Sequence, residues 1–158
     1  MGVEVGAPAP EFSLPGTSGT VESRRTYALA EARGETLVLV FYPGDATPVC
    51  TRQLNAYSHD IERFGEVGAT VWAISPQGLE SHDEFSCAQG GFGFPLLADT
   101  DKAVGGAYGI LGPLGFYRRS VFVVDPLGVV RYAHRAVAGL TYRSTDELVA
   151  AVRAATAA

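Results

Sequence analysis

The sequence predicts a three-layer α/β sandwich, in which helices cover both faces of a central mixed β-sheet. Three runs of consecutive apolar residues, at 36–42, 69–75 and 120–124, are typical of strands that are buried on both faces. Amphipathic segments with helical spacing alternate with these runs, which favours strands joined by crossover helices. The turn at 125–128 then predicts an antiparallel hairpin, and a closing helix is predicted to start at Thr145.

The shorter elements are expected from weaker local signals. An N-terminal β-hairpin is predicted from residues 11–14 and 20–22, which flank the Pro-, Gly- and Ser-rich turn at 15–19. Amphipathic spacing and glycine stop signals predict the remaining helices. These predicted helices lie at residues 27–33, 50–64, 79–89 and 101–108, and a short strand is predicted at 94–98.

Length and composition fit one domain spanning residues 1–158. A hydrophobic content of 47% with 18% charged residues is typical of a compact protein and excludes a disordered chain. The net charge of −5, without a basic stripe, argues against a nucleic-acid partner or an anionic membrane partner. No apolar run approaches the roughly 18 residues of a membrane span. No secretory signal is visible, so we expect a cytoplasmic protein with reduced thiols.

The loop after the first buried strand carries a candidate nucleophile. Thr47 suits the N-cap of the following helix and Pro48 its first position, which places Cys50 at the third position. Backbone N–H groups near that position lack intrahelical partners, and the helix dipole is positive there. Both features favour the thiolate over the thiol. Cys50 is therefore the predicted nucleophile of this chain.

Other kinds of functional site are less well supported. Two cysteines in a reducing compartment indicate redox chemistry rather than a permanent disulfide. His59, His82 and His134 lack the spacing of a zinc site, so we predict no metal centre and interpret them as solvated surface residues. The chain has no Cys-x-x-Cys pair or Gly-x-Ser-x-Gly motif, which excludes an ordinary thioredoxin or a serine hydrolase.

The segment 43–50, with its Pro-x-x-x-Thr-x-x-Cys spacing, resembles the signature of peroxiredoxins, particularly their bacterioferritin-comigratory (Q-type) branch. Segments 7–12, 73–75, 94–99 and 119–125 resemble the same family in the same order, so that the resemblance covers nearly the whole chain. It implies a thioredoxin-like fold and a thiol peroxidase that reduces hydrogen peroxide and organic hydroperoxides. It also implies that no metal, haem or flavin cofactor is needed.

The resemblance implies a role for each residue of the motif. Cys50 would be the peroxidatic cysteine, and Thr47 would hydrogen-bond the incoming peroxide. Pro43 would shield the pocket from water, and the amides near Val49 would add hydrogen-bond donors. Arg119 would favour the thiolate and orient the peroxide.

Two neighbouring arginines compete for that last role. Because consecutive residues of a strand point to opposite faces, only one of Arg118 and Arg119 can enter the pocket. The family spacing to Asp125 selects Arg119.

The second cysteine leaves the mechanism open. Cys87 matches the place where some Q-type enzymes keep a resolving cysteine, which implies a disulfide with Cys50 that thioredoxin or a similar dithiol reopens. The commoner resolving position holds Asn55, and Gln53 stands where most relatives carry a glutamate. The alternatives are a one-cysteine cycle with Cys87 as a bystander, or a non-enzymatic redox sensor or holdase. We expect a monomer, with a dimer as the alternative.

Overall fold

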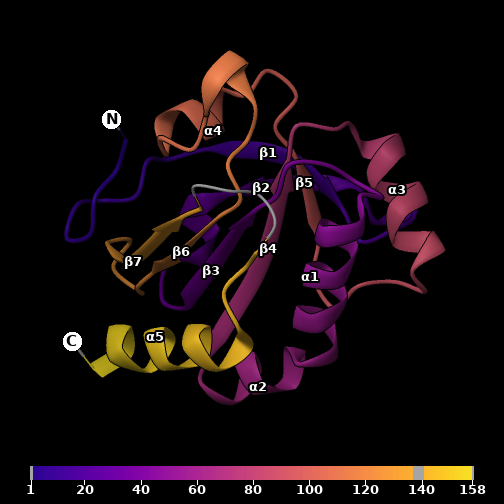
Figure 1. The fold of residues 1–158 in the computed structure, drawn as a ribbon. Helices are drawn as coiled ribbons and strands as arrows, with labels where there is room; N and C mark the ends of the chain where they lie inside the picture. Colours follow the sequence, from indigo (N-terminus) through magenta and orange to yellow (C-terminus); the bar gives the residue numbers. More distant parts are fainter. Residues whose placement is uncertain (1, 137–140, 158) are drawn as a thin grey trace.

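A computed structural model of the chain describes residues 2–136 and 141–157 (Figure 1). Within these residues, seven strands form one mixed sheet in the order β2-β1-β5-β4-β3-β6-β7. The strand β3 lies near its centre, parallel to β4 and antiparallel to β6. The strands are β1 (Ser13–Thr17), β2 (Arg25–Ala28), β3 (Thr36–Phe41), β4 (Ala69–Ser75), β5 (Leu96–Ala98), β6 (Ser120–Val124) and β7 (Val130–Arg135).

Helices cover both faces of this sheet, as the sequence predicted. They are α1 (Pro48–His59), α2 (Ile61–Glu66), α3 (Leu79–Ala88), α4 (Ala103–Ala107) and α5 (Thr145–Ala157), with short 3-10 turns η1 (Val21–Ser23), η2 (Leu29–Ala32) and η3 (Pro113–Gly115). In Figure 1, α4 lies at the opposite side of the sheet from α1, α2 and α5. Among the described residues, none of these helices has the length and apolar character needed to cross a membrane.

The central strand β3 is buried at every position because its side chains enter two different cores. Its odd-numbered residues pack with the N-terminal segment, Trp72 and α4. Its even-numbered residues, and Tyr42 directly after it, pack with α1, α2 and α5. Cys50 belongs to this second core, so the predicted nucleophile lies inside the molecule.

An N-terminal β-hairpin is present, but both of its strands differ from the predicted ones, since β1 spans Ser13–Thr17 and β2 spans Arg25–Ala28. The first strand continues through Pro15 and Gly16 to Thr17, and residues 20–22 belong to the turn region around η1. The helix predicted at 27–33 is absent, since residues 25–28 form β2 and only 29–32 form a 3-10 turn. Tyr27 provides the physical reason. Its backbone is extended, which lets its ring pack edge-on against Trp72 with the two ring centroids 5.3 Å apart.

The single helix predicted over residues 50–64 is two helices. Asp60 separates α1 from α2 and has non-helical angles of φ −96° and ψ 16°. Both helices still bury one stripe against the sheet, including Leu54, Tyr57 and Phe64. The break lies at the far end of α1. The first turn of α1, which carries Cys50, therefore begins as predicted.

Candidate active site

The first turn of α1 holds Cys50 at the predicted position. Thr47 is the N-cap residue, with an extended backbone at φ −81° and ψ 148°, and Pro48 is the first helical residue. The amide of Thr51 donates to the carbonyl of Thr47 at 2.8 Å, which closes the first turn of the helix. The amides of Val49 and Cys50 precede that bond, so they are available to a negative charge at this end of the helix.

The side chain of Thr47 does not cap the helix. Its hydroxyl instead donates to the carbonyl of the buried Gly44 at 3.0 Å, while Thr47 as a whole is exposed. Pro43, at the start of the same loop, is half-buried. Thr47 and Cys50 therefore both belong to the first turn of α1, and Pro43 lies at the start of the loop that leads into it.

A guanidinium group contacts the sulfur from the neighbouring strand. Arg119, directly before β6, places Nη1 at 3.3 Å from Sγ of Cys50. The thiol is fully buried and Arg119 is only 4% exposed. Burial alone disfavours a charged thiolate, whereas a cation donating to the sulfur favours it. The helix start and Arg119 together supply the compensation that a buried thiolate requires.

The two neighbouring arginines separate as the strand alternation predicted. Arg118 Nε donates to the carbonyl of Ala136 at 3.0 Å, and Arg118 Nη2 lies 3.5 Å from the carbonyl of Arg135. Arg119 alone of the pair contacts Cys50.

Gln53 lies one helical turn after Cys50 and is also fully buried. Its Oε1 accepts a hydrogen bond from the same Arg119 Nη1, at 2.5 Å. The amide thus orients the guanidinium beside the sulfur and adds no negative charge to the site. Its own Nε2 has no hydrogen-bond partner among the described residues.

Replacing Gln53 by glutamate tests this arrangement. A carboxylate there competes for the charge of Arg119 and repels the thiolate, so the reactivity of Cys50 with hydrogen peroxide at neutral pH should fall by up to about tenfold. Stopped-flow rates at neutral pH measure this effect. Asn55→Asp is the matched control, because it adds the same charge to the same helix at a side chain that contacts Gln89 instead. An equal shift in both variants would contradict the orienting role.

The structure contains no disulfide between Cys87 and Cys50. Cys87 is the penultimate residue of α3 and is exposed, beside a groove that Thr20 and Val21 also line. Ala88 lines both this groove and a second one, which Thr51 of α1 also borders and which Cys87 does not line. Both cysteines are free thiols, with Cys50 buried and Cys87 exposed.

One histidine was wrongly interpreted as a surface residue. His82 on α3 is completely buried, and its Nδ1 lies 2.7 Å from Oδ2 of Asp45 in the active-site loop. Tyr42 and Ser81 donate to the same carboxylate at 2.6 and 2.7 Å. The helical spacing of His82 to the buried Phe85 was the signal that could have placed it inside. His59 is exposed and His134 is half-buried.

The charge of Asp45 is stabilised by this contact. Burial alone would raise the pKa of its carboxyl group, but hydrogen bonds and the charge of His82 more than offset that effect. The pKa of Asp45 consequently lies below its ordinary value. Among residues 2–136 and 141–157, no three His, Cys, Asp or Glu side chains gather as they would around a metal ion.

Comparison with known proteins identifies the family and the fold. Residues 5–133 match the model of the AhpC/TSA family. The chain is 34% identical to a putative peroxiredoxin of the rubredoxin operon of Clostridium pasteurianum, over 95% of this chain and 88% of that protein. It is also 34% identical to peroxiredoxin Bcp of Xanthomonas campestris, over 93% of this chain and 92% of that protein.

Solved structures give the same result. Peroxiredoxin Q of Xanthomonas campestris superposes with a TM-score of 0.76 at 32% identity, over 89% of this chain and 90% of that one. AhpC of Mycobacterium tuberculosis has a TM-score of 0.87 at 22% identity, over 98% and 93%, and supports the fold alone. The sheet, the buried cysteine at a helix start and these relatives lead to one conclusion: the chain belongs to the AhpC/TSA family and is a peroxiredoxin, a peroxidase of the oxidoreductase class.

Proposed function

We propose that Cys50 is the peroxidatic cysteine, which reduces hydrogen peroxide and organic hydroperoxides. Its thiolate sulfur attacks the nearer peroxide oxygen, so that an S–O bond forms while the O–O bond breaks. Cys50 is left as a sulfenic acid, and the departing hydroxide or alkoxide takes up a proton and leaves as water or alcohol. The observation that carries this proposal is the 3.3 Å contact between Arg119 Nη1 and the sulfur at a helix start.

The other motif residues have supporting roles in this proposal. Arg119 stabilises first the thiolate and then the charge that develops on the departing oxygen. The amides of Val49 and Cys50 and the Thr47 hydroxyl are donors for the peroxide, and Gln53 positions the guanidinium. Pro43, which has no N–H group, borders the pocket and limits the access of water and excess peroxide to the sulfenic acid.

Cys87 is the resolving cysteine in the cycle that we propose. Its thiol condenses with the Cys50 sulfenic acid, an S–S bond forms, and the hydroxyl leaves as water. A disulfide requires Cα atoms within about 7 Å, so α3 has to loosen before this step. The helix ends directly before Gly90 and Gly91, whose positive φ angles of 79° and 91° suit a turn that unwinds easily. Thioredoxin or a similar dithiol then reduces the disulfide in the cytoplasm, with the enzyme acting as a monomer.

Mass spectrometry after one equivalent of hydrogen peroxide tests this cycle, together with Cys87→Ser. The wild-type protein should lose two hydrogens and yield a peptide that joins Cys50 to Cys87. The Cys87→Ser protein should accumulate the sulfenic acid, and its turnover with thioredoxin should fall at least about tenfold, because resolution must then come from an external thiol. Unchanged turnover in this variant would refute the resolving role.

A one-cysteine cycle is the second candidate, and the exposure of Cys87, which contrasts with the complete burial of Cys50, favours it. In that cycle the reductant attacks the Cys50 sulfenic acid directly, and the wild-type protein forms no internal disulfide. A redox sensor or holdase on the same fold would behave differently from both peroxidase cycles. It would oxidise rapidly at Cys50, would not be recycled by a dithiol, and would form a stable complex with a partner protein.

A further inference from the structure

The active-site loop is attached to α3 by one buried carboxylate. Asp45 accepts hydrogen bonds from Tyr42, at the end of β3, and from Ser81 and His82 on α3. Its backbone amide donates to Gln77 Oε1 at 3.0 Å. The carboxylate therefore joins the loop that precedes Cys50 to the helix that carries Cys87.

The hydrogen bonds of His82 indicate that its ring carries both protons. Nδ1 faces the carboxylate of Asp45, and Nε2 faces the carbonyl oxygen of Leu97 at 3.0 Å. Both partners offer acceptor oxygens, an arrangement that suits a ring with a proton on each nitrogen. The side-chain exposures are 0% for His82 and 4% for Asp45, so the contact is shielded from water and forms an ion pair when the ring is doubly protonated. Other ionisable groups border this pair: Tyr42 donates to the same carboxylate, Glu84 shares the lining of a groove with Asp45, and Asp83 directly follows His82 on α3.

The ion pair lies beside a strained point of the backbone. Ala46, the next residue after Asp45, has a φ of 61°, in the left-handed region that residues other than glycine rarely adopt. Such a conformation persists only where its surroundings fix it. Thr47, the N-cap of α1, follows directly. The carboxylate of Asp45 is thus placed to hold the strained loop that presents the first turn of α1, and Cys50 with it.

We propose that His82 is a positioning residue of the peroxidase, and that its ion pair with Asp45 holds the active-site loop in the closed conformation that attacks peroxide. This inference rests on the proposed role of Cys50. The pair acts on the loop and not on the sulfur, because Arg119, and not His82, contacts Cys50. Breaking it opens the loop, which separates the sulfur from its aligned donors and exposes it to larger molecules.

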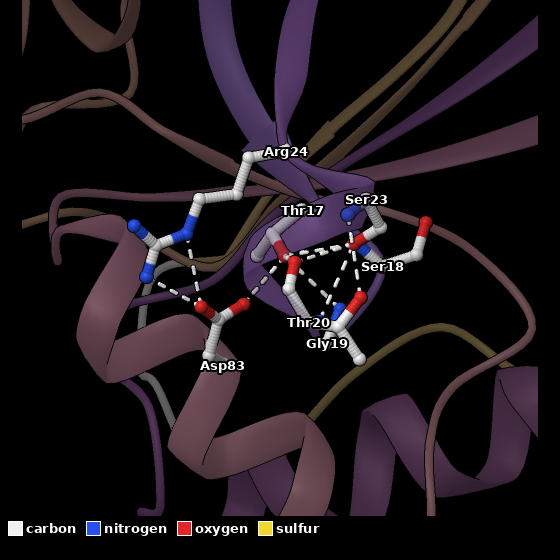
Figure 2. Close-up of polar contacts among 7 residues, drawn as sticks. All are labelled: Thr17, Ser18, Gly19, Thr20, Ser23, Arg24 and Asp83. Atoms are coloured by element: carbon white, nitrogen blue, oxygen red, sulfur yellow. Dashed lines mark hydrogen bonds and ion pairs between the residues drawn. The ribbon is translucent and has the colours of Figure 1, made fainter.

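The chain offers a matched control on the same helix. Asp83, the residue after His82, fixes α3 to the β1–β2 connection through Thr17 and Arg24 (Figure 2). The residues that Figure 2 draws around Asp83 come from the end of β1 and the connection to β2, and not from the active-site loop. Asp83→Asn therefore weakens a polar anchor of α3 that does not involve Asp45.

Two reagents of different size test the proposal in a Cys87→Ser background, where Cys50 is the remaining thiol. Cys50 is fully buried, so a bulky maleimide reacts only after local opening, whereas hydrogen peroxide reacts in the closed site. His82→Gln should raise the maleimide rate about tenfold and lower the peroxide rate about tenfold. Local opening exposes the thiol to maleimide and depletes the closed conformation that reacts with peroxide. Asp45→Asn should produce the same pair of changes, and the double variant should add little. Asp83→Asn should leave both rates within about twofold of the parent.

The maleimide rate and the peroxide rate are expected to change in opposite directions, which separates this proposal from simpler effects. A change in thiolate reactivity alone would move both rates in the same direction, and general destabilisation would make Asp83→Asn resemble His82→Gln. Either result would overturn the proposal, as would His82→Gln rates equal to those of the parent. If His82→Gln fails to fold, Asp45→Asn decides between the same outcomes. If the parent reacts with peroxide no faster than free cysteine, the proposed function fails, and the maleimide rates still decide whether the ion pair closes the loop.

Nitrogen NMR gives an independent readout of the ring. At neutral pH, both ring nitrogens of His82 should carry protons in the parent protein. The Asp45→Asn variant should lose the Nδ1 proton or exchange it rapidly, because its acceptor is then uncharged. A neutral His82 ring in the parent would overturn the ion pair on which the proposal depends.

Discussion

Cys50→Ser is expected to abolish peroxide reduction, with residual consumption equal to that of buffer. A serine hydroxyl in the same place is not ionised at neutral pH, even beside Arg119 and a helix start, so the nucleophile is lost and not merely weakened. Peroxide consumption with an excess of thioredoxin and its reductase measures the effect. The protein should stay folded, since the change replaces one small buried side chain by another.

Cys87→Ser provides the comparison for that result. It removes the exposed thiol and keeps the buried one, so it should still consume one equivalent of peroxide in a single turnover. Peroxide consumption by Cys50→Ser that proceeds at the rate of the wild type would show that the reaction takes place elsewhere in the chain.

Arg119→Met has the second largest expected effect. The change removes the cation that donates to the sulfur at 3.3 Å and keeps most of the side-chain volume. Loss of a preorganised charge at a reacting centre typically costs about 10²–10³-fold, so the rate constant for hydrogen peroxide should fall by about that factor. Stopped-flow measurement of the Cys50 sulfenic acid gives this rate directly.

The neighbouring residue supplies the control for this prediction. Arg118→Met removes the same charge one residue away, from a guanidinium that donates to the backbone carbonyl of Ala136. It should change the peroxide rate less than about threefold, because long-range charge effects are screened by salt. Equal losses in the two variants would indicate a general effect of net charge, and would contradict the specific role of Arg119.

The sequence predicted the elements that depend on local pattern. The buried strands β4 and β6 have the predicted bounds, and α1 begins with Thr47 as its N-cap, because apolar runs and a Thr-Pro start are short-range signals. The segment at 27–33 was predicted wrongly as a helix, since its strand pairing with β1 and the contact of Tyr27 with Trp72 are long-range interactions.

In the candidate site too, local sequence predicted some positions and long-range contacts determined the others. The position of Cys50 at the third residue of a helix follows from its immediate neighbours. The contact with Arg119, 69 residues later, required the family resemblance, since strand alternation does not decide which arginine faces inward. The partner of His82 lies 37 residues earlier, in the loop. No local pattern connects the two, so a buried ion pair was mistaken for a solvated side chain.

The ionisation state of Cys50 tests the central claim most directly. In the folded Cys87→Ser protein at neutral pH, the ultraviolet absorbance band of a thiolate should be present, and it should disappear when the protein is unfolded at the same pH. Arg119→Met should weaken the band in the folded state. A folded protein whose Cys50 remains a protonated thiol at neutral pH, with the same absorbance as the unfolded chain, would contradict the account.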